Sequence, residues 1–314
     1  GTSSVGTGTL TLTALGGDIT QSSSSAGFKQ TTGASAATFN AGTGVNANNI
    51  TLDKTGNNFA GQVNLIGRNI VFHSDPGTKL TVTLSTTGSA SIKADPNIEG
   101  AVGTDLAVDA VGTATNFGPN LATTVGGNLS LTNTDTVTQS AGKSVQVAGT
   151  TLIDGTAKNA AITLNDTANR FTGTATFKGS TIQVIDSGAL DATLQAIDAS
   201  ILKAGGNLSV MGTAKSLTTT TTGGGDTTAT ALTVTGGDLT VFSAGKTIIG
   251  AGPAGLTAGY EFVRPTADDP DRAWAEVGPY VLHEVQTYTS FQTPGQKSLP
   301  SVHAASIDES ARYL

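Results

Sequence analysis

The chain has 314 residues, no cysteine, only 12% charged residues and a formal net charge of −7. The acidic balance removes the general attraction to phosphate backbones, and the missing cysteine excludes disulfide scaffolds, thiolate zinc sites and thiol catalysis, so nucleic acid is not an expected partner. No apolar run approaches the roughly 20 residues of a membrane-spanning helix, so membrane insertion is not expected either.

The composition favours β-structure. Glycine contributes 41 residues and threonine 54. The branched Cβ of threonine is stiff at χ1 and packs well on a pleated surface. Glycine, asparagine and aspartate suit the corners between strands, where a positive φ is often required. We therefore expect an all-β protein built from many short strands.

Short alternating runs follow one another along the chain. Apolar residues occupy every second position, with Thr, Ser or Gln between many of them, as a half-buried strand requires. The runs are Leu10/Leu12, Leu80/Val82/Leu84, Leu129/Leu131, Val145/Val147, Ile162/Leu164, Ile182/Val184, Leu232/Val234 and Leu239/Val241.

Residues 191–204 have an apolar spacing that a helix could also show, but their neighbours favour further strands. Residues 22–25 and 218–225 are expected to be loops, and the interval 85–125 gives no clear strand.

The chain also repeats itself. Three segments recur, namely 56–74 in 168–187, 49–52 in 161–164 and 18–22 in 136–140. The first alignment, GNNFAGQVNLIGRNIVFHS on ANRFTGTATFKGSTIQVIDS, places Phe59 on Phe171 at an offset of 112 residues. A shorter signature recurs as GGNLSL, GGNLSV and GGDLTV, beginning at Gly126, Gly205 and Gly236.

Short strands in copies that gain or lose a few residues favour a β-solenoid over a β-sandwich, because each coil of a solenoid contacts only its neighbours. Coils of about 20 residues would give residues 1–259 on the order of a dozen coils. At about 4.8 Å per coil, the rod would be roughly 60 Å long. Inward apolar side chains would stack into columns, outward Thr and Ser would form ladders, and Asn could stack at equivalent corners.

The segment from Gly126 to Ser187, with GGNLSLTNTDTVTQSAGKSVQVAGTTL and ITLNDTANRF, resembles the repeat region of bacterial exoproteins of the filamentous-haemagglutinin type. The resemblance covers most of residues 1–259. It implies a right-handed parallel β-helix, export by two-partner secretion, and a role in adhesion, aggregation or biofilm at the bacterial cell surface. The chain departs from this family in lacking an Asn-Pro-Asn-Gly motif and a recognisable secretion domain. It starts at Gly1, and we expect it to be part of a longer precursor.

Residues 260–314 differ from residues 1–259 and do not match the repeat. All four Tyr and the single Trp lie there, and residues 280–292 alternate as a strand or hairpin would. An open solenoid end presents unpaired backbone groups. We therefore expect this irregular segment either to cap that end or to complete the sheet of a second copy, which would give end-to-end self-association. The side chains assigned to this capping or assembly role are Tyr260, Trp274, Tyr280, Tyr288 and Phe291.

The sequence contains no constellation of catalytic, metal-binding or cofactor-binding residues. His73, His283 and His303 lack metal-ligand spacing, and the acidic cluster at 268–271 is interpreted as a solvated turn and not as a Ca²⁺ site. The Asp residues of the repeat region stand singly and its one Glu is Glu99, whereas a polysaccharide-cleaving β-helix enzyme needs converging carboxylates.

These observations favour a secreted, non-enzymatic rod or fibre building block for adhesion or matrix formation, with no cofactor. Its partners would be further copies of itself, further repeats of the precursor, or a host or glycan receptor. A polysaccharide-cleaving enzyme and a phage-type trimeric spike are the alternatives.

Overall fold

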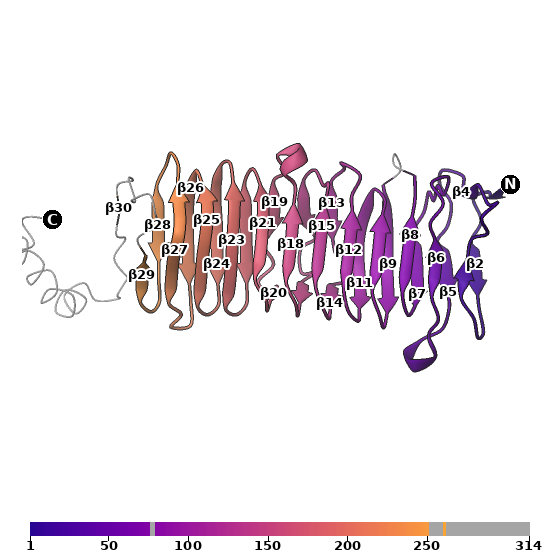
Figure 1. Cartoon of the computed structure of the whole chain (residues 1–314), viewed down its shortest axis with the longest axis horizontal. Coiled ribbons are helices and arrows are strands. Elements are labelled where there is room, and N and C mark those ends of the chain that lie inside the picture. The colour runs from indigo at the N-terminus through magenta and orange to yellow at the C-terminus, as the bar shows by residue number, and fades with distance from the viewer. Residues whose placement is uncertain (76–78, 251–259, 262–314) are drawn as a thin grey trace, which may run out of the picture. The chain divides into compact units, whose positions relative to one another are not determined.

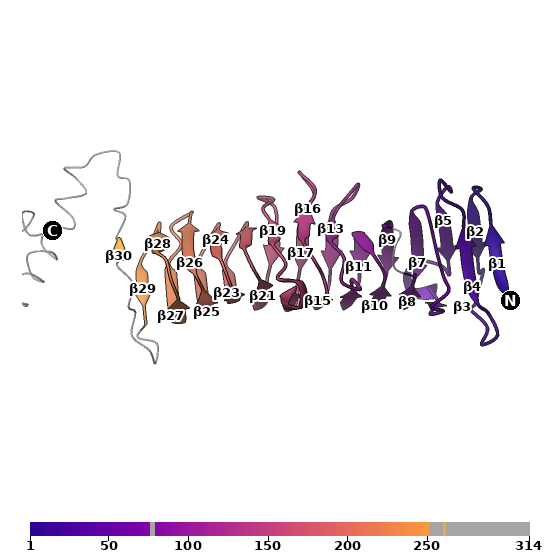
Figure 2. The same cartoon turned by 90° about the horizontal axis from the view of Figure 1, so that it is seen from above.

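The computed structural model describes residues 1–75, 79–250 and 260–261. Over these residues the chain forms a parallel β-solenoid, which confirms the predicted all-β class and the stacking of successive coils (Figure 1). Two long sheets run along the solenoid as two layers that face each other, which Figure 2 shows from above. We call them the 12-strand sheet and the 16-strand sheet.

Each coil contributes a strand to each of the two sheets. The 12-strand sheet stacks β3 (Ile19–Thr20), β6 (Ile50–Leu52), β8 (Ile70–His73), β10 (Ala90–Lys93), β12 (Leu106–Asp109), β15 (Leu129–Thr132), β18 (Thr151–Asp154), β21 (Ala175–Gly179), β23 (Leu190–Ala196), β25 (Leu208–Ala214), β27 (Thr227–Val234) and β29 (Thr247–Ile249).

The 16-strand sheet stacks β2 (Leu10–Thr13), β5 (Ala37–Asn40), β7 (Val63–Gly67), β9 (Leu80–Thr86), β11 (Pro96–Val102), β13 (Thr115–Phe117), β16 (Val137–Gln139), β19 (Ile162–Leu164), β22 (Ile182–Asp186), β24 (Ala199–Ala204), β26 (Ser216–Thr221), β28 (Leu239–Phe242) and β30 (Tyr260–Glu261). It forks at β11, where β14 (Thr123–Val125), β17 (Val145–Val147) and β20 (Arg170–Phe171) form a side branch. A separate pair joins β1 (Thr2–Val5) to β4 (Gly27–Gln30).

Inward side chains stack into continuous columns, as predicted. One column of the 12-strand sheet consists of Ile19, Ile50, Ile70, Ala90, Leu106, Leu129, Thr151, Ala175, Ala192, Val210, Ala229 and Ile249. The 230 residues from Ile19 to Ile249 span eleven steps, so a coil averages about 21 residues. Because each step removes apolar surface from water on both sides of a side chain, the columns are the main source of stability.

Phe59 and Phe171 occupy equivalent core positions, as their alignment predicts. Both side chains are fully buried. Each stands edge-on to a second phenylalanine, with ring centroids 5.8 Å apart for Phe59 and Phe39 and 5.9 Å apart for Phe171 and Phe177. These ring partners are not equivalent, since Phe177 aligns with Leu65. The recurring phrase therefore places a buried phenylalanine at the same point of the coil, with different neighbours.

The two copies nevertheless lie in opposite sheets. Strand β6 belongs to the 12-strand sheet and its equivalent β19 to the 16-strand sheet, while β7 and its equivalent β21 show the reverse arrangement. The reason is that one repeat spans eleven half-coils, an odd number. The 3₁₀ turns η1 (Gly44–Asn46) and η2 (Thr156–Lys158), which are equivalent, accordingly project from opposite edges in Figure 1.

The loop predicted at residues 218–225 is wrong for residues 218–221, while residues 222–225 do form a turn. Residues 218–221 belong to β26, because Thr219 and Thr221 point inward and are buried while Thr218 and Thr220 point outward; a branched Cβ suits that strand. Residues 22–25 do form a loop. Residues 191–204 form β23 and β24, not a helix, as their neighbours indicate.

Candidate functional site

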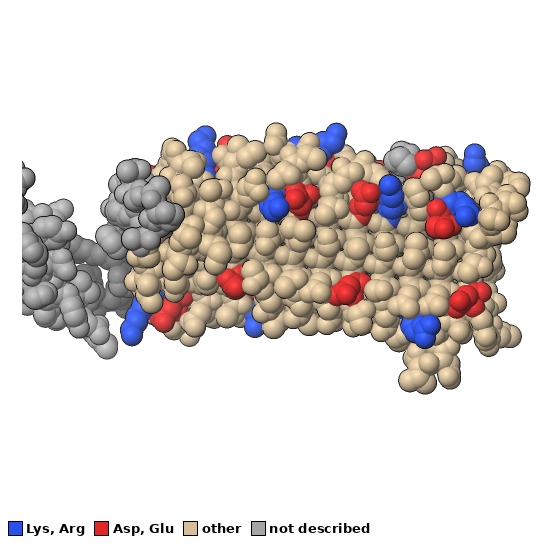
Figure 3. Space-filling model, viewed as in Figure 1, with Lys and Arg blue, Asp and Glu red and all other residues tan. Residues whose placement is uncertain are grey.

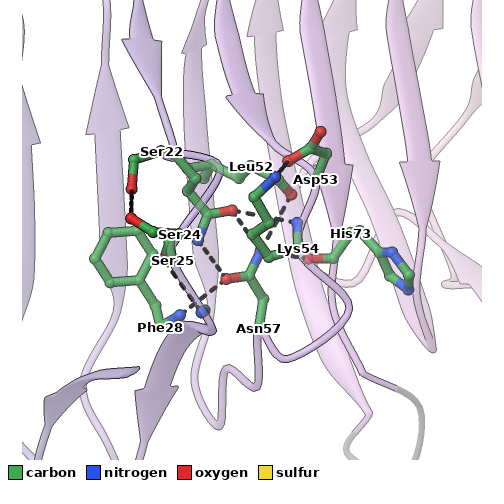
Figure 4. Close-up of polar contacts among 11 residues, drawn as sticks. Ser22, Ser24, Ser25, Phe28, Leu52, Asp53, Lys54, Asn57 and His73 are labelled. Atoms are coloured by element: carbon green, nitrogen blue, oxygen red, sulfur yellow. Dashed lines mark hydrogen bonds and ion pairs between the residues drawn. The ribbon is translucent and has the colours of Figure 1, made fainter. Parts of the chain in front are cut away.

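An amide pair, the buried Asn57 with the half-buried Gln21, is the centre of a polar cluster in the first repeat copy (Figure 4). Asn57 is fully buried. Its Oδ1 accepts hydrogen bonds from Gln21 Nε2 at 2.7 Å and from the backbone N–H of Phe28 at 2.9 Å. Its Nδ2 lies 2.9 Å from Gln21 Oε1, 3.0 Å from the carbonyl oxygen of His73 and 3.2 Å from that of Leu52. The pair thus fastens three successive coils to one another.

The second copy contains the same network. Asn169 is fully buried, and its Oδ1 accepts from Gln139 Nε2 and, at 2.8 Å, from the backbone N–H of Val145. Its Nδ2 donates to Gln139 Oε1 at 3.0 Å and to the carbonyl oxygen of Leu164 at 3.2 Å. Buried amides cost free energy unless every donor and acceptor is paired, and reciprocal pairing satisfies this requirement. The network closes a corner and has no free group to offer a substrate.

A second recurring feature lies on the surface, at the corner where the chain enters the 12-strand sheet. There the Oδ1 of an Asn or Asp accepts the backbone N–H of the equivalent residue in the next coil. The contacts are Asp18 with Asn49 at 2.8 Å, Asn69 with Ser89 at 3.1 Å, Asp105 with Asn128 at 2.7 Å, Asn128 with Thr150 at 2.8 Å, Asn207 with Asp226 at 2.9 Å and Asp226 with Lys246 at 2.6 Å. We call these residues the corner ladder.

The corner ladder explains why Gly-Gly precedes Asn128 in the recurring signature. A Cβ on Gly127 would lie 2.5 Å from Asp105 Oδ1, and one on Gly126 would lie 2.2 Å from the carbonyl oxygen of Gly103. Asparagine was expected to stack its amides at such corners. In the described ranges an amide-to-amide bond occurs between Asn69 Nδ2 and Asn49 Oδ1, at 3.0 Å, whereas the other rungs use the backbone N–H.

Two buried carboxylates serve the fold. Glu99 is 1% exposed, and its oxygens accept from Thr83 Oγ1 at 2.7 Å and from the N–H groups of Asn120 and Leu121 at 2.6 and 3.1 Å. Asp186, also 1% exposed, accepts from Arg170 Nη1 at 3.0 Å and from the N–H groups of Phe171 and Gly188. Their oxygens accept from backbone N–H groups and from side chains of adjacent coils, so both carboxylates serve the packing of the solenoid.

Asp154 carries a lowered pKa. Burial raises the pKa of this carboxyl, but hydrogen bonds from the side chain and backbone of Thr156 and the charge of Lys178 outweigh burial and lower it. Thr156 Oγ1 lies 2.7 Å and Lys178 Nζ 3.4 Å from the carboxylate. A carboxyl with a folded pKa below its unfolded value contributes stability above the unfolded pKa, and this contribution disappears as the pH falls through the folded pKa.

We therefore expect Asp154→Asn to lower the free energy of unfolding at pH 7 by less than about 1 kcal/mol, because the ion pair is partly solvated. The Asn side chain can still accept from Thr156, so the change isolates the charge. Denaturant unfolding at pH 7 and at pH 3 measures the effect. A difference from the parent chain that persists unchanged at the lower pH would contradict the assigned cause.

The side chains predicted to cap or assemble the C-terminal end mostly lie outside the described residues. This holds for Trp274, Tyr280, Tyr288 and Phe291. Tyr260 belongs to β30, whose backbone pairs in parallel with β28 through Tyr260 and Leu239. Of the histidines, His73 ends β8 in the repeat region, and His283 and His303 fall outside the described part.

Residues 1–66 and 103–178 match a family model described as repeats of unknown function (DUF5649). The two matches end 112 residues apart, at Ile66 and Lys178, which is the offset between the structural copies. No curated protein and no solved structure shows a match to this chain. The DUF5649 match thus agrees with the repeat that the coordinates show: this is a β-solenoid repeat protein.

No group of three or more His, Asp and Glu in residues 1–75, 79–250 and 260–261 is placed to hold a metal ion. The same part of the chain contains no helix with the length and apolarity needed to cross a membrane.

Proposed function

We propose that the chain is a non-enzymatic, extracellular structural or adhesive rod at the bacterial cell surface, similar in role to the repeat region of filamentous-haemagglutinin-type exoproteins. One observation carries this proposal: the positions that stay identical between segments 56–74 and 168–187 of the two copies serve the packing of the solenoid, and none of them is an exposed polar side chain. A repeated catalytic or ligand-binding site would require the opposite pattern.

The aligned segments 56–74 and 168–187 show this pattern residue by residue. Five positions are identical: Asn57/Asn169, Phe59/Phe171, Gly61/Gly173, Gly67/Gly179 and Ile70/Ile182. The Asn, Phe and Ile side chains are buried, and a Cβ on any of the four glycines would come within 2.8 Å of a carbonyl oxygen in the preceding coil. Other positions differ, both outward ones such as Val71 and Gln183 and inward ones such as Leu65 and Phe177, a pair that stays apolar. The repetition therefore preserves the solenoid and not a set of exposed functional groups.

The charge distribution also supports a structural role. On the face in Figure 3, acidic and basic groups stand singly or in pairs along the solenoid and do not gather over one groove. Pairs such as Lys93 with Asp109, 3.6 Å apart, and Lys178 with Asp154 link neighbouring coils. A surface rich in uncharged polar groups suits a long exposed shaft, because it stays hydrated without strong self-repulsion.

Adhesion and rod formation can be tested on the purified full chain. Negative-stain electron micrographs should show rods or end-to-end fibres, and beads coated with the chain should adhere to bacterial or epithelial cells more than beads coated with albumin. Release of reducing ends from a panel of acidic and neutral polysaccharides would overturn the proposal in favour of an enzyme. Sedimentation as a stable trimer would instead support a spike.

A further inference from the structure

Three asparagines at the corners of the 12-strand sheet begin Asn-x-Ser/Thr triplets. They are Asn49-Ile50-Thr51, Asn128-Leu129-Ser130 and Asn207-Leu208-Ser209. Each asparagine directly precedes a strand of this sheet, β6, β15 and β25, which are its second, sixth and tenth strands. All three therefore lie on one edge of the solenoid, four coils apart, or about 19 Å at the usual strand spacing.

The side chains of Asn128 and Asn207 are held in one orientation. Both residues are exposed. Asn128 Oδ1 accepts from the N–H and the Oγ1 of Thr150, both at 2.8 Å, and Asn207 Oδ1 accepts from the N–H of Asp226 at 2.9 Å. Within the described residues the Nδ2 of either asparagine donates no hydrogen bond. The oxygen thus serves the corner ladder and the nitrogen is available.

The hydroxyl of each triplet lies on the same side of the chain as the asparagine. Successive residues of a strand point to opposite faces, so positions two apart share a face. Leu129 and Leu208 point into the core, while Ser130 and Ser209 point outward and are half-buried. Neither serine hydroxyl makes a hydrogen bond to another described residue. Amide and hydroxyl are therefore presented together, as an Asn-x-Ser/Thr acceptor requires.

We propose that Asn128 and Asn207, and to a smaller extent Asn49, are acceptor sites for N-linked glycosylation, with a nucleoside diphosphate sugar as donor. A glycosyltransferase forms a bond between Nδ2 and the anomeric carbon of the sugar, the bond from that carbon to the diphosphate oxygen breaks, and Nδ2 loses a proton to a basic group of the transferase. The nucleoside diphosphate leaves. Because Oδ1 keeps its bond to the next coil, the sugar adds to the edge without opening the corner ladder.

Asn49 is less accessible than the other two. Its Oδ1 accepts from Asn69 Nδ2 at 3.0 Å, and its Nδ2 lies 3.5 Å from Asp18 Oδ2. A fourth triplet, Asn165-Asp166-Thr167, lies in the loop between β19 and β20 and not at this corner. An Asn165→Gln background removes it from the measurement.

Asn69 provides a matched control within the chain. It occupies the same corner, directly before β8, and its Oδ1 accepts from the N–H of Ser89 at 3.1 Å; unlike Asn128, it also donates from Nδ2 to Asn49 Oδ1 at 3.0 Å. Position 71, however, is valine, so Asn69 has no hydroxyl two residues later. Val71→Thr would create the triplet there, and Ser130→Ala would remove it from Asn128 while leaving the ladder bond in place.

The test uses the folded full chain carrying Asn165→Gln, a soluble N-glycosyltransferase specific for Asn-x-Ser/Thr, and UDP-glucose. Intact mass and peptide mapping should find hexose at Asn128 and Asn207, less at Asn49 and none at Asn69. Ser130→Ala should lose the hexose at Asn128. Val71→Thr creates the triplet at an asparagine whose Nδ2 already donates to Asn49 Oδ1, so it should gain less hexose at Asn69 than Asn128 carries. The circular dichroism of the modified chain should match that of the unmodified chain.

Two results would overturn the inference. One is transfer to the urea-unfolded chain but not to the folded chain, which would show that the corner geometry hides the acceptor. The other is absence of transfer to either form while an unrelated acceptor peptide is modified in the same reaction. Neither result bears on adhesion, so this inference and the proposed function stand or fall separately.

Discussion

Gly100→Ala should destabilise the solenoid by about 3 kcal/mol or more, since it combines backbone strain with a steric clash. Gly100 lies in β11 with φ +98°, and a Cβ there would lie 2.1 Å from the carbonyl oxygen of Leu84 in the preceding coil. Relief would require the two coils to separate and would weaken the pairing of β11 with β9. Because long solenoids need not unfold in one step, hydrogen exchange of the amides in β9 and β11 is the measurement.

Gly142→Ala is the matched control for this change. Gly142 also has a positive φ, +70°, but a Cβ there would meet nothing within 4 Å. Only the cost of a left-handed backbone remains, about 1 kcal/mol. Gly212, 112 residues after Gly100, has φ +101° and a Cβ site 2.0 Å from the carbonyl oxygen of Leu194. Gly212→Ala should therefore resemble Gly100→Ala, and equal effects for Gly100→Ala and Gly142→Ala would refute the clash.

Strands and coils could be predicted from the sequence because alternation reports directly which side chains point inward. The runs at Leu80/Val82/Leu84 and Ile182/Val184 became β9 and β22. In the interval 85–125 the signal is hidden, because Ile98 and Glu99 are adjacent in β11 and both are buried. A buried carboxylate whose partners lie in the coils before and after it breaks the apparent alternation, and no local pattern reveals the N–H groups that satisfy it.

The relation between the two copies could not be predicted in the same way. An offset of 112 residues shows that the copies exist, but the sheet that each strand joins depends on how many half-coils lie between them. Insertions at the corners change the number of residues in a coil, so an offset in residues does not give the number of half-coils. The step is 31 residues from Ile19 to Ile50 and 16 from Ala90 to Leu106. The amide pairs were missed for a related reason, since Gln and Asn are 36 residues apart in the first copy and 30 in the second.

Asn169→Ala should cost about 3 kcal/mol, because it leaves several buried polar groups without partners at once. The N–H of Val145, the carbonyl of Leu164 and both ends of the Gln139 amide lose their bonds to Asn169. Water can reach Gln139, which is half-buried, but not the two backbone groups as easily. Amide exchange of Val145 should accelerate most, and thermal unfolding should shift downward. Asn165→Ala, an exposed change in the same loop, should have little effect.

A double-mutant cycle decides whether the reciprocal bonds themselves matter. If Gln139 and Asn169 act as one unit, removing both should cost less than the two single changes added together, with a coupling of about 1 kcal/mol or more. The equivalent cycle on Gln21 and Asn57 should give a similar value, because the partners and distances correspond. Purely additive losses in both copies would mean that the bonds between the two side chains add nothing to stability, and the fastening of successive coils would then depend on the bonds from each asparagine to backbone groups, on the corner ladder and on the apolar columns.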